Sequence, residues 1–235
     1  MGEARRKRET HEERLKRFPY CIYCGGQNPA TSIDHMPPIM MFKGRQRPDG
    51  LIFPACDDCN QGTRHSDLVA SMLGRLYPDA PDPTEKSDFI KTISAVKNNV
   101  PGLLEELHLD EAEQELARKR LGISIGTGFL RLGGPLVTNH MKVFAAKLGL
   151  ALFFDATGNA LPVTGRIVPF WFSNVQSLQG KIPSEFLKAL PEPKTLAQGK
   201  KSVADQFQYS QSCPRRRTGQ VFSPHFAFLS PLVAS

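Results

Sequence analysis

The sequence predicts an α+β protein in which a small ββα module precedes a larger α+β companion domain. Three observations favour this fold class. Two CxxC pairs, Cys21/Cys24 and Cys56/Cys59, lie near the N-terminus. Short apolar runs typical of strands lie between and beside them, and segments with the apolar spacing of helices follow. With 235 residues, the chain is long enough for such a module and a second unit.

The paired cysteines predict a structural metal site. A turn of two residues brings both sulfurs of a CxxC pair to one side of a metal ion, and four thiolates satisfy tetrahedral zinc. We therefore expect Zn²⁺ at Cys21, Cys24, Cys56 and Cys59. Such a closed site leaves no open position for a substrate, so its expected role is to stabilise the fold. Disulfides and an iron–sulfur cluster are weaker alternatives, the latter because clusters often show tighter cysteine spacings.

The insert between the cysteine pairs contains the residues suited to chemistry. Residues 31–35, TSIDH, alternate like a short strand and end in Asp34 and His35. Residues 51–55, LIFPA, predict a second strand that leads into the second pair, and Asn60 directly after this pair starts the expected helix. In a ββα unit a carboxylate, an imidazole and an amide can converge. Such a set suits one hard cation and one general base.

Together these residues resemble the HNH endonucleases of the ββα-metal fold, in their zinc-containing form. The matching pattern is CxxC, Asp-His followed by a proline, and CxxC-Asn, within residues 20–77. The resemblance implies that Asp34 and Asn60 bind a catalytic divalent ion, Mg²⁺ or Mn²⁺, and that His35 is the general base acting on water. It also implies hydrolysis of DNA phosphodiester bonds, in restriction, phage defence or mobile-element biology.

One position departs from the family pattern. The family's middle polar residue, usually an asparagine near the start of the second strand, orders the loop by bonding backbone groups, and Leu51 stands at its place. We expect Asp49 to replace it as an Asx-type turn former. The departure keeps open a second hypothesis, a non-cleaving, zinc-stabilised nucleic-acid-binding module. A third hypothesis is a nuclease that a ligand or partner of the C-terminal half switches on.

The charge of the chain favours a polyanionic partner. The net charge is +7 and the pI is about 9.3, with the excess of basic residues in the N-terminal arm, residues 1–19, and in the C-terminal half. We expect double-stranded DNA as the partner. The basic side chains expected to contact it are Lys43, Arg45, Arg47 and Arg64. One HNH site cuts one strand, so a double-strand break needs a homodimer or two successive visits.

From the composition of the sequence we expect neither a membrane span nor a signal peptide. No apolar run approaches the length of a span, and the N-terminus is charged where a signal peptide needs an apolar core. We therefore expect a cytoplasmic protein without a membrane partner. That compartment also favours metal over disulfides for the paired cysteines.

Residues 78–235 predict an α+β companion domain, separated from the module by the proline-rich residues 77–84. Apolar spacing and capping residues predict helices from Asn60 to about residue 77, from Thr84 to about Asn98, after Pro101, from Asp110 to Gly122, and from Thr138 to about residue 149. Apolar runs predict strands at residues 150–154, 166–172, 202–209 and 220–228.

Overall fold

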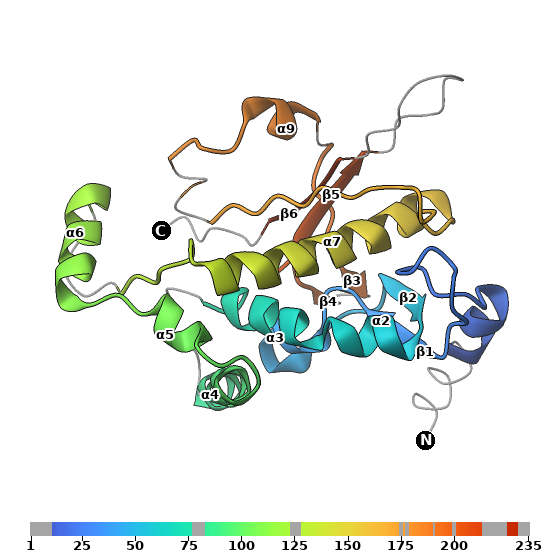
Figure 1. Cartoon of the computed structure of the whole chain (residues 1–235), viewed down its shortest axis with the longest axis horizontal. Coiled ribbons are helices and arrows are strands. Elements are labelled where there is room, and N and C mark those ends of the chain that lie inside the picture. Colours follow the sequence, from blue (N-terminus) through green and yellow to red (C-terminus); the bar gives the residue numbers. More distant parts are fainter. Residues whose placement is uncertain are drawn as a thin grey trace.

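Helices and short antiparallel strands make up the protein, which confirms the α+β class (Figure 1). The computed structural model describes residues 11–76, 83–122, 128–173, 176, 179–189, 191–198, 201–212 and 225–229. Of the expected N-terminal arm, residues 11–17 are helical and the preceding ten lie outside the described residues. The expected boundary segment also falls largely outside them, at residues 77–82.

The first two strands pair in an antiparallel hairpin. They are β1 (Ser32–His35) and β2 (Ile52–Ala55), and each begins one residue later than the sequence predicts. The loop between them contains two 3-10 turns, η1 (Ile39–Met41) and η2 (Lys43–Arg45). The hairpin is therefore two short strands joined by a long, partly buried loop.

Two helices follow the hairpin directly. Helix α2 (Asp57–Gly62) starts three residues before Asn60, with two aspartates in its first turn, where acidic groups favour a helix N-terminus. Helix α3 (Arg64–Leu73) continues after a break at Thr63. The expected single helix to residue 77 is therefore wrong, since it is divided at Thr63 and the last helical residue is Leu73.

Three further helices lie near the predicted positions. They are α4 (Pro83–Asn99), α5 (Leu103–Leu107) and α6 (Glu111–Leu121). The capping box is confirmed, since Asp110 Oδ1 accepts a 2.8 Å hydrogen bond from the Glu113 backbone N–H and the Asp110 backbone N–H donates one of 3.1 Å to Glu113 Oε2.

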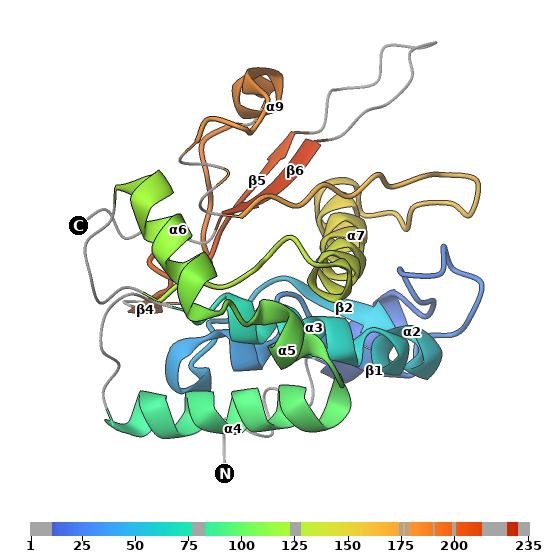
Figure 2. The same ribbon diagram turned by 60° about the vertical axis from the view of Figure 1, so that its left-hand side comes forward.

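Helix α7 (Pro135–Thr157) lies between the α2–α3 segment and a sheet of β5 (Gln208–Ser212) and β6 (His225–Leu229), as Figures 1 and 2 show. It begins before the expected Thr138, because a proline suits the first helical turn. It also continues through residues 150–154, so the strand predicted there is wrong. The apolar run continues the helix's buried face rather than forming a strand.

The C-terminal strands only partly match the prediction. Residues 166–172 form no strand, and residues 202–209 are divided between β4 (Lys201–Ser202), a turn and β5. β4 pairs with β3 (Ala197–Gln198), and a short helix, α9 (Ser184–Ala189), was not expected. Of the strand predicted at 220–228, residues 225–228 lie in β6 and residues 220–224 lie outside the described residues, so only part of these apolar runs forms regular pairs.

One hydrophobic core joins the two predicted units. Its buried members include Phe53 of β2, Val69 of α3, Leu148 and Leu152 of α7, and Phe207 near the start of β5. Helix α7 thus packs directly against the segment that contains the paired cysteines. Within the described ranges, no helix has the length and apolar character needed to cross a membrane.

Candidate functional site

The four paired cysteines form a cluster. The sulfur atoms of Cys21, Cys24, Cys56 and Cys59 all lie within 4.8 Å of one another, and all four are free thiols. Cys56 immediately precedes α2 and Cys59 lies inside it, so the cluster connects the chain before β1 to the end of β2. Four sulfurs about 2.3 Å from a common centre satisfy tetrahedral zinc. The cluster therefore fits a structural zinc ion, as the sequence predicts.

Nearby N–H groups point at these sulfurs. The backbone N–H of Tyr23 donates to Cys21 Sγ at 3.4 Å, and that of Asn28 donates to Cys24 Sγ at 3.4 Å. The Asn28 side chain lies 3.8 Å from Cys56 Sγ. Such donors orient the thiolates of a metal site and tune their charge.

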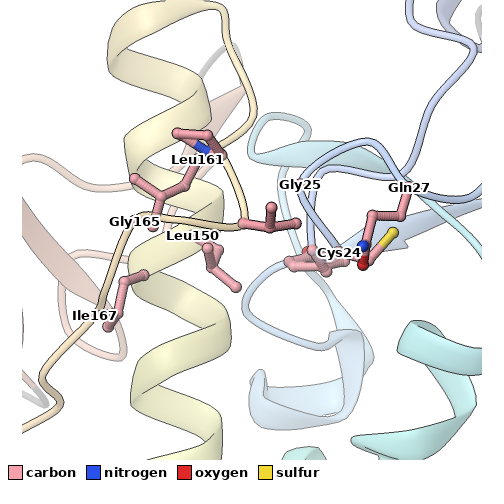
Figure 3. Close-up of a pocket in the computed structure, with 10 residues that line it drawn as sticks. Cys24, Gly25, Gln27, Leu150, Leu161, Gly165 and Ile167 are labelled. Carbon is pink, nitrogen blue, oxygen red and sulfur yellow. The ribbon is translucent and has the colours of Figure 1, made fainter.

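A pocket of about 300 Å³ lies between the loop that contains Cys24 and part of α7 (Figure 3). One wall contains Gly25, and the facing wall contains Leu150 of α7 and the segment from Leu161 to Ile167. Gly25 has a φ of +65°, and a Cβ there would lie 2.9 Å from the carbonyl oxygen of Leu161. The close approach of these two segments therefore requires glycine at this position.

Asp34 and Asn60 lie on one face of the hairpin. Ser32 and Asp34 are two residues apart on β1, so their side chains share a face. Asn60 of α2 donates from Nδ2 to Ser32 Oγ at 3.2 Å, which places its amide over this face. The side-chain oxygen of Asn60, Oδ1, has no hydrogen-bond partner among the described residues and is the atom that suits a hard cation.

Asp34 is 8% exposed and belongs to a buried polar network. The Tyr23 hydroxyl donates to Asp34 Oδ2 at 2.6 Å, and Lys147 Nζ of α7 lies 3.1 Å from the same oxygen. Lys147 Nζ also lies 2.7 Å from Asp67 Oδ2. Burial raises the pKa of Asp67 to about 6, although Lys147 acts in the opposite direction. Sequence reasoning missed Tyr23, Lys147 and Asp67, and the only visible signal was a lysine within the apolar run of α7.

His35 projects from the opposite face of β1, because successive strand residues alternate. Its ring lies edge-on to that of His11, with centroids 5.9 Å apart. Burial lowers the pKa of His35 to about 4, and the charges of Arg47 and His11 act in the same direction. The imidazole is therefore neutral at pH 7. The structure brings Asp34 and Asn60 to one face and places His35 on the other.

Arg47, an expected DNA contact, bonds inside the loop between β1 and β2. Its guanidinium donates to the carbonyl oxygens of Met36, Pro37, Pro48, Gly50 and Leu51 at 2.7–3.3 Å. Burial lowers its pKa to about 10, while nearby carboxylates oppose this shift. Arg47 therefore orders the loop by binding backbone groups, the task expected of Asp49.

The other expected DNA contacts have protein partners as well. These partners are Asp205 for Lys43 (3.7 Å), Asp88 for Arg45 (3.3 Å) and His65 for Arg64 (3.2 Å). Arg64 and Arg45 are exposed. Ion pairs and hydrogen bonds at exposed positions are weak, so a phosphate can compete for these side chains.

Comparison with known proteins gave no relative, since no family model, curated protein or solved structure matches the chain.

Proposed function

We propose that the protein is a metal-dependent endonuclease of the HNH type that hydrolyses DNA phosphodiester bonds. The observation that supports this best is the shared face of Asp34 and Asn60 beside the four-cysteine cluster. The cluster connects β2 to α2, and α2 places Asn60 over the strand that bears Asp34. This is the neighbourhood that the sequence resemblance implies for a divalent ion.

The donor atoms at this face fit Mg²⁺ or Mn²⁺. Asp34 Oδ2 has two partners, whereas Asp34 Oδ1 has none among the residues described, and neither has Asn60 Oδ1. Both are hard oxygen ligands. When bound, a divalent ion supplies charge stabilisation for the phosphorane-like transition state and the leaving oxygen.

His35 acts in this proposal as the general base that takes the proton of the attacking water. Its lowered pKa keeps Nδ1 and Nε2 available as one acceptor and one donor at neutral pH. His35 is the last residue of β1. The scissile phosphate would bind across this strand end, with the cation ligands on one side and the imidazole on the other.

A second candidate function is a zinc-stabilised nucleic-acid-binding module that does not cleave. It is favoured by the opposite orientation of Asp34 and His35, and by the Lys147 ammonium beside Asp34. In this case the basic side chains and the four-cysteine cluster would act without a catalytic ion.

Nicking of supercoiled plasmid by zinc-loaded protein separates the two functions. We expect Mg²⁺- or Mn²⁺-dependent nicks that EDTA abolishes and that His35→Ala lowers at least about 100-fold. His108→Ala is the matched control, because His108 is exposed at the C-terminal end of α5 and has no assigned role. Salt-sensitive DNA binding without cleavage under either metal would favour the binding module.

A further inference from the structure

The buried network around Asp34 connects α7 to the face that holds Asp34 and Asn60. Lys147 is 3% exposed, and its ammonium lies between two carboxylates, 3.1 Å from Asp34 and 2.7 Å from Asp67. Its Nζ also lies 5.5 Å from the centre of the Tyr23 ring. A buried ammonium is costly unless it is paired, so these contacts compensate its desolvation.

Both polar contacts of Asp34 fall on the same oxygen. The Tyr23 hydroxyl and Lys147 Nζ each contact Oδ2, and Oδ1 contacts no donor within the described part of the chain. A carboxylate held in this way has a fixed plane and one unused oxygen. That is the arrangement expected of a monodentate cation ligand with an outer layer of supporting groups.

Asp67 supplies the restraint on the lysine. It is largely buried on α3, its Oδ2 makes the shorter of the two contacts with Lys147, and its Oδ1 is buried without a hydrogen-bond partner in the described residues. The chain Asp67, Lys147, Asp34, Tyr23 thus joins α3, α7, β1 and the first cysteine pair. No feature of the sequence resemblance includes Lys147, which lies far beyond residue 77.

We propose that Lys147 and Tyr23 are positioning residues of the divalent-ion site, which hold Asp34 by Oδ2 so that Oδ1 binds the ion, and that Asp67 fixes Lys147 in this position. This inference rests on the proposed function for the identity of the ion site. Its consequence is that α7 completes the site, so residues 20–77 alone do not contain all of it.

The test uses Mn²⁺ alone as the probe of the zinc-loaded full chain, with free Mn²⁺ measured by electron paramagnetic resonance. Tyr23→Phe removes a single oxygen and is expected to weaken Mn²⁺ binding about 10-fold or more, with zinc content unchanged. Lys142→Met is the matched control, because Lys142 is an exposed lysine of the same helix, and it should bind Mn²⁺ as the wild type does.

Lys147→Met alone leaves two buried carboxylates without their cation and is expected to lower stability. The double variant Lys147→Met with Asp67→Asn removes one positive and one negative charge together. We expect its thermal unfolding to return towards that of the wild type while its Mn²⁺ affinity stays about 10- to 100-fold lower. If the role of Lys147 were purely structural, the double variant would recover both the thermal midpoint and the Mn²⁺ affinity of the wild type.

The outcomes distinguish this inference from the proposed function. Mn²⁺ binding that Asp34→Asn abolishes and that Tyr23→Phe and the double variant weaken supports the inference, even where no DNA is cleaved. Folded, zinc-loaded Tyr23→Phe and double variants that bind Mn²⁺ as tightly as the wild type would overturn it. Wild-type protein without an Asp34-dependent Mn²⁺ site would overturn it too.

Discussion

The Nη2 atom of Arg47 donates a 3.2 Å hydrogen bond to the carbonyl oxygen of Leu51. Leu51 has a left-handed backbone, with a φ of +46°, and stands where the HNH pattern has a polar residue. Arg47 thus orders the loop through main-chain carbonyls. Asp49, the expected replacement, instead accepts a 2.7 Å bond from Gln198 of β3. Arg47, four residues before Leu51, therefore makes backbone bonds of the kind that the resemblance implies for a polar residue at position 51.

Arg47→Lys is expected to destabilise the loop although it keeps the charge. An ammonium cannot reproduce the planar fork that reaches carbonyls on several sides, so buried acceptors lose their partners. We expect a loss of about 2 kcal/mol or more in the free energy of unfolding, measured in urea. Arg64→Lys, at an exposed position, is the matched control and should unfold as the wild type does. Equal stability of the two variants would contradict the role given to Arg47.

Gly25→Ala is expected to loosen the contact between the first cysteine pair and the segment after α7. The added Cβ would meet the Leu161 carbonyl oxygen at 2.9 Å, and the left-handed backbone adds strain. Gly122→Ala has the same φ of +65° with no atom within 4 Å, so it reports the strain alone. Thermal unfolding should show the lower midpoint for Gly25→Ala. Equal thermal midpoints for the two variants would contradict a tight contact between Gly25 and Leu161.

His35 should make stability depend on pH. Its folded pKa of about 4 lies below the ordinary value of 6.5, so the unfolded chain binds more protons between these values. Stability from this group is therefore lost as pH falls from 6.5 towards 4. Because His35 is partly exposed, we expect the free energy of unfolding to fall by up to about 1 kcal/mol between pH 7 and 5.5.

Urea unfolding of zinc-loaded protein at these two pH values tests this point. His35→Gln should lose less stability on acidification than the wild type, because the variant lacks the titrating group. His108→Gln, at an exposed position on the C-terminal side of α5, should follow the wild type. A wild-type loss no greater than that of His35→Gln would contradict the lowered pKa.

Removal of zinc should unfold the segment around the cysteine cluster. The cluster connects the chain before β1 to α2, and the hairpin between them pairs at four positions in each strand, so the ion is expected to fix the ends of this segment. We expect chelation to lower the thermal midpoint by about 10 °C or more, and added Zn²⁺ to restore it. An unchanged midpoint after verified loss of the metal would show that the thiols do not stabilise the fold through an ion.

Local sequence signals predicted part of this arrangement well. The CxxC spacing predicted the cluster of Cys21, Cys24, Cys56 and Cys59, and the Asp110 and Glu113 pair predicted a capping box, because both depend on neighbours in sequence. The length of α7 was missed, since an apolar run of five residues suits a buried helix as well as a strand. Contacts between residues far apart in the sequence leave no local pattern from which they can be predicted.

The contacts of the candidate site show this limit. The partnership of Asp34 with Lys147 joins residues more than one hundred positions apart, and neither periodicity nor spacing indicates it. Arg47 was expected to face a phosphate because of its charge, whereas its carbonyl partners depend on how the loop closes. Tertiary packing, not residue type, decides which basic side chain supports the loop and which remains exposed.

The decisive measurement is anomalous diffraction from crystals of zinc-loaded protein soaked in Mn²⁺. We expect a manganese peak beside Oδ1 of Asp34 and Oδ1 of Asn60, separate from a zinc peak among the four sulfurs, and loss of the manganese peak in Asp34→Asn. A manganese-soaked crystal with zinc at the cysteines and no manganese at Asp34 would contradict the ion site and the nuclease function built on it.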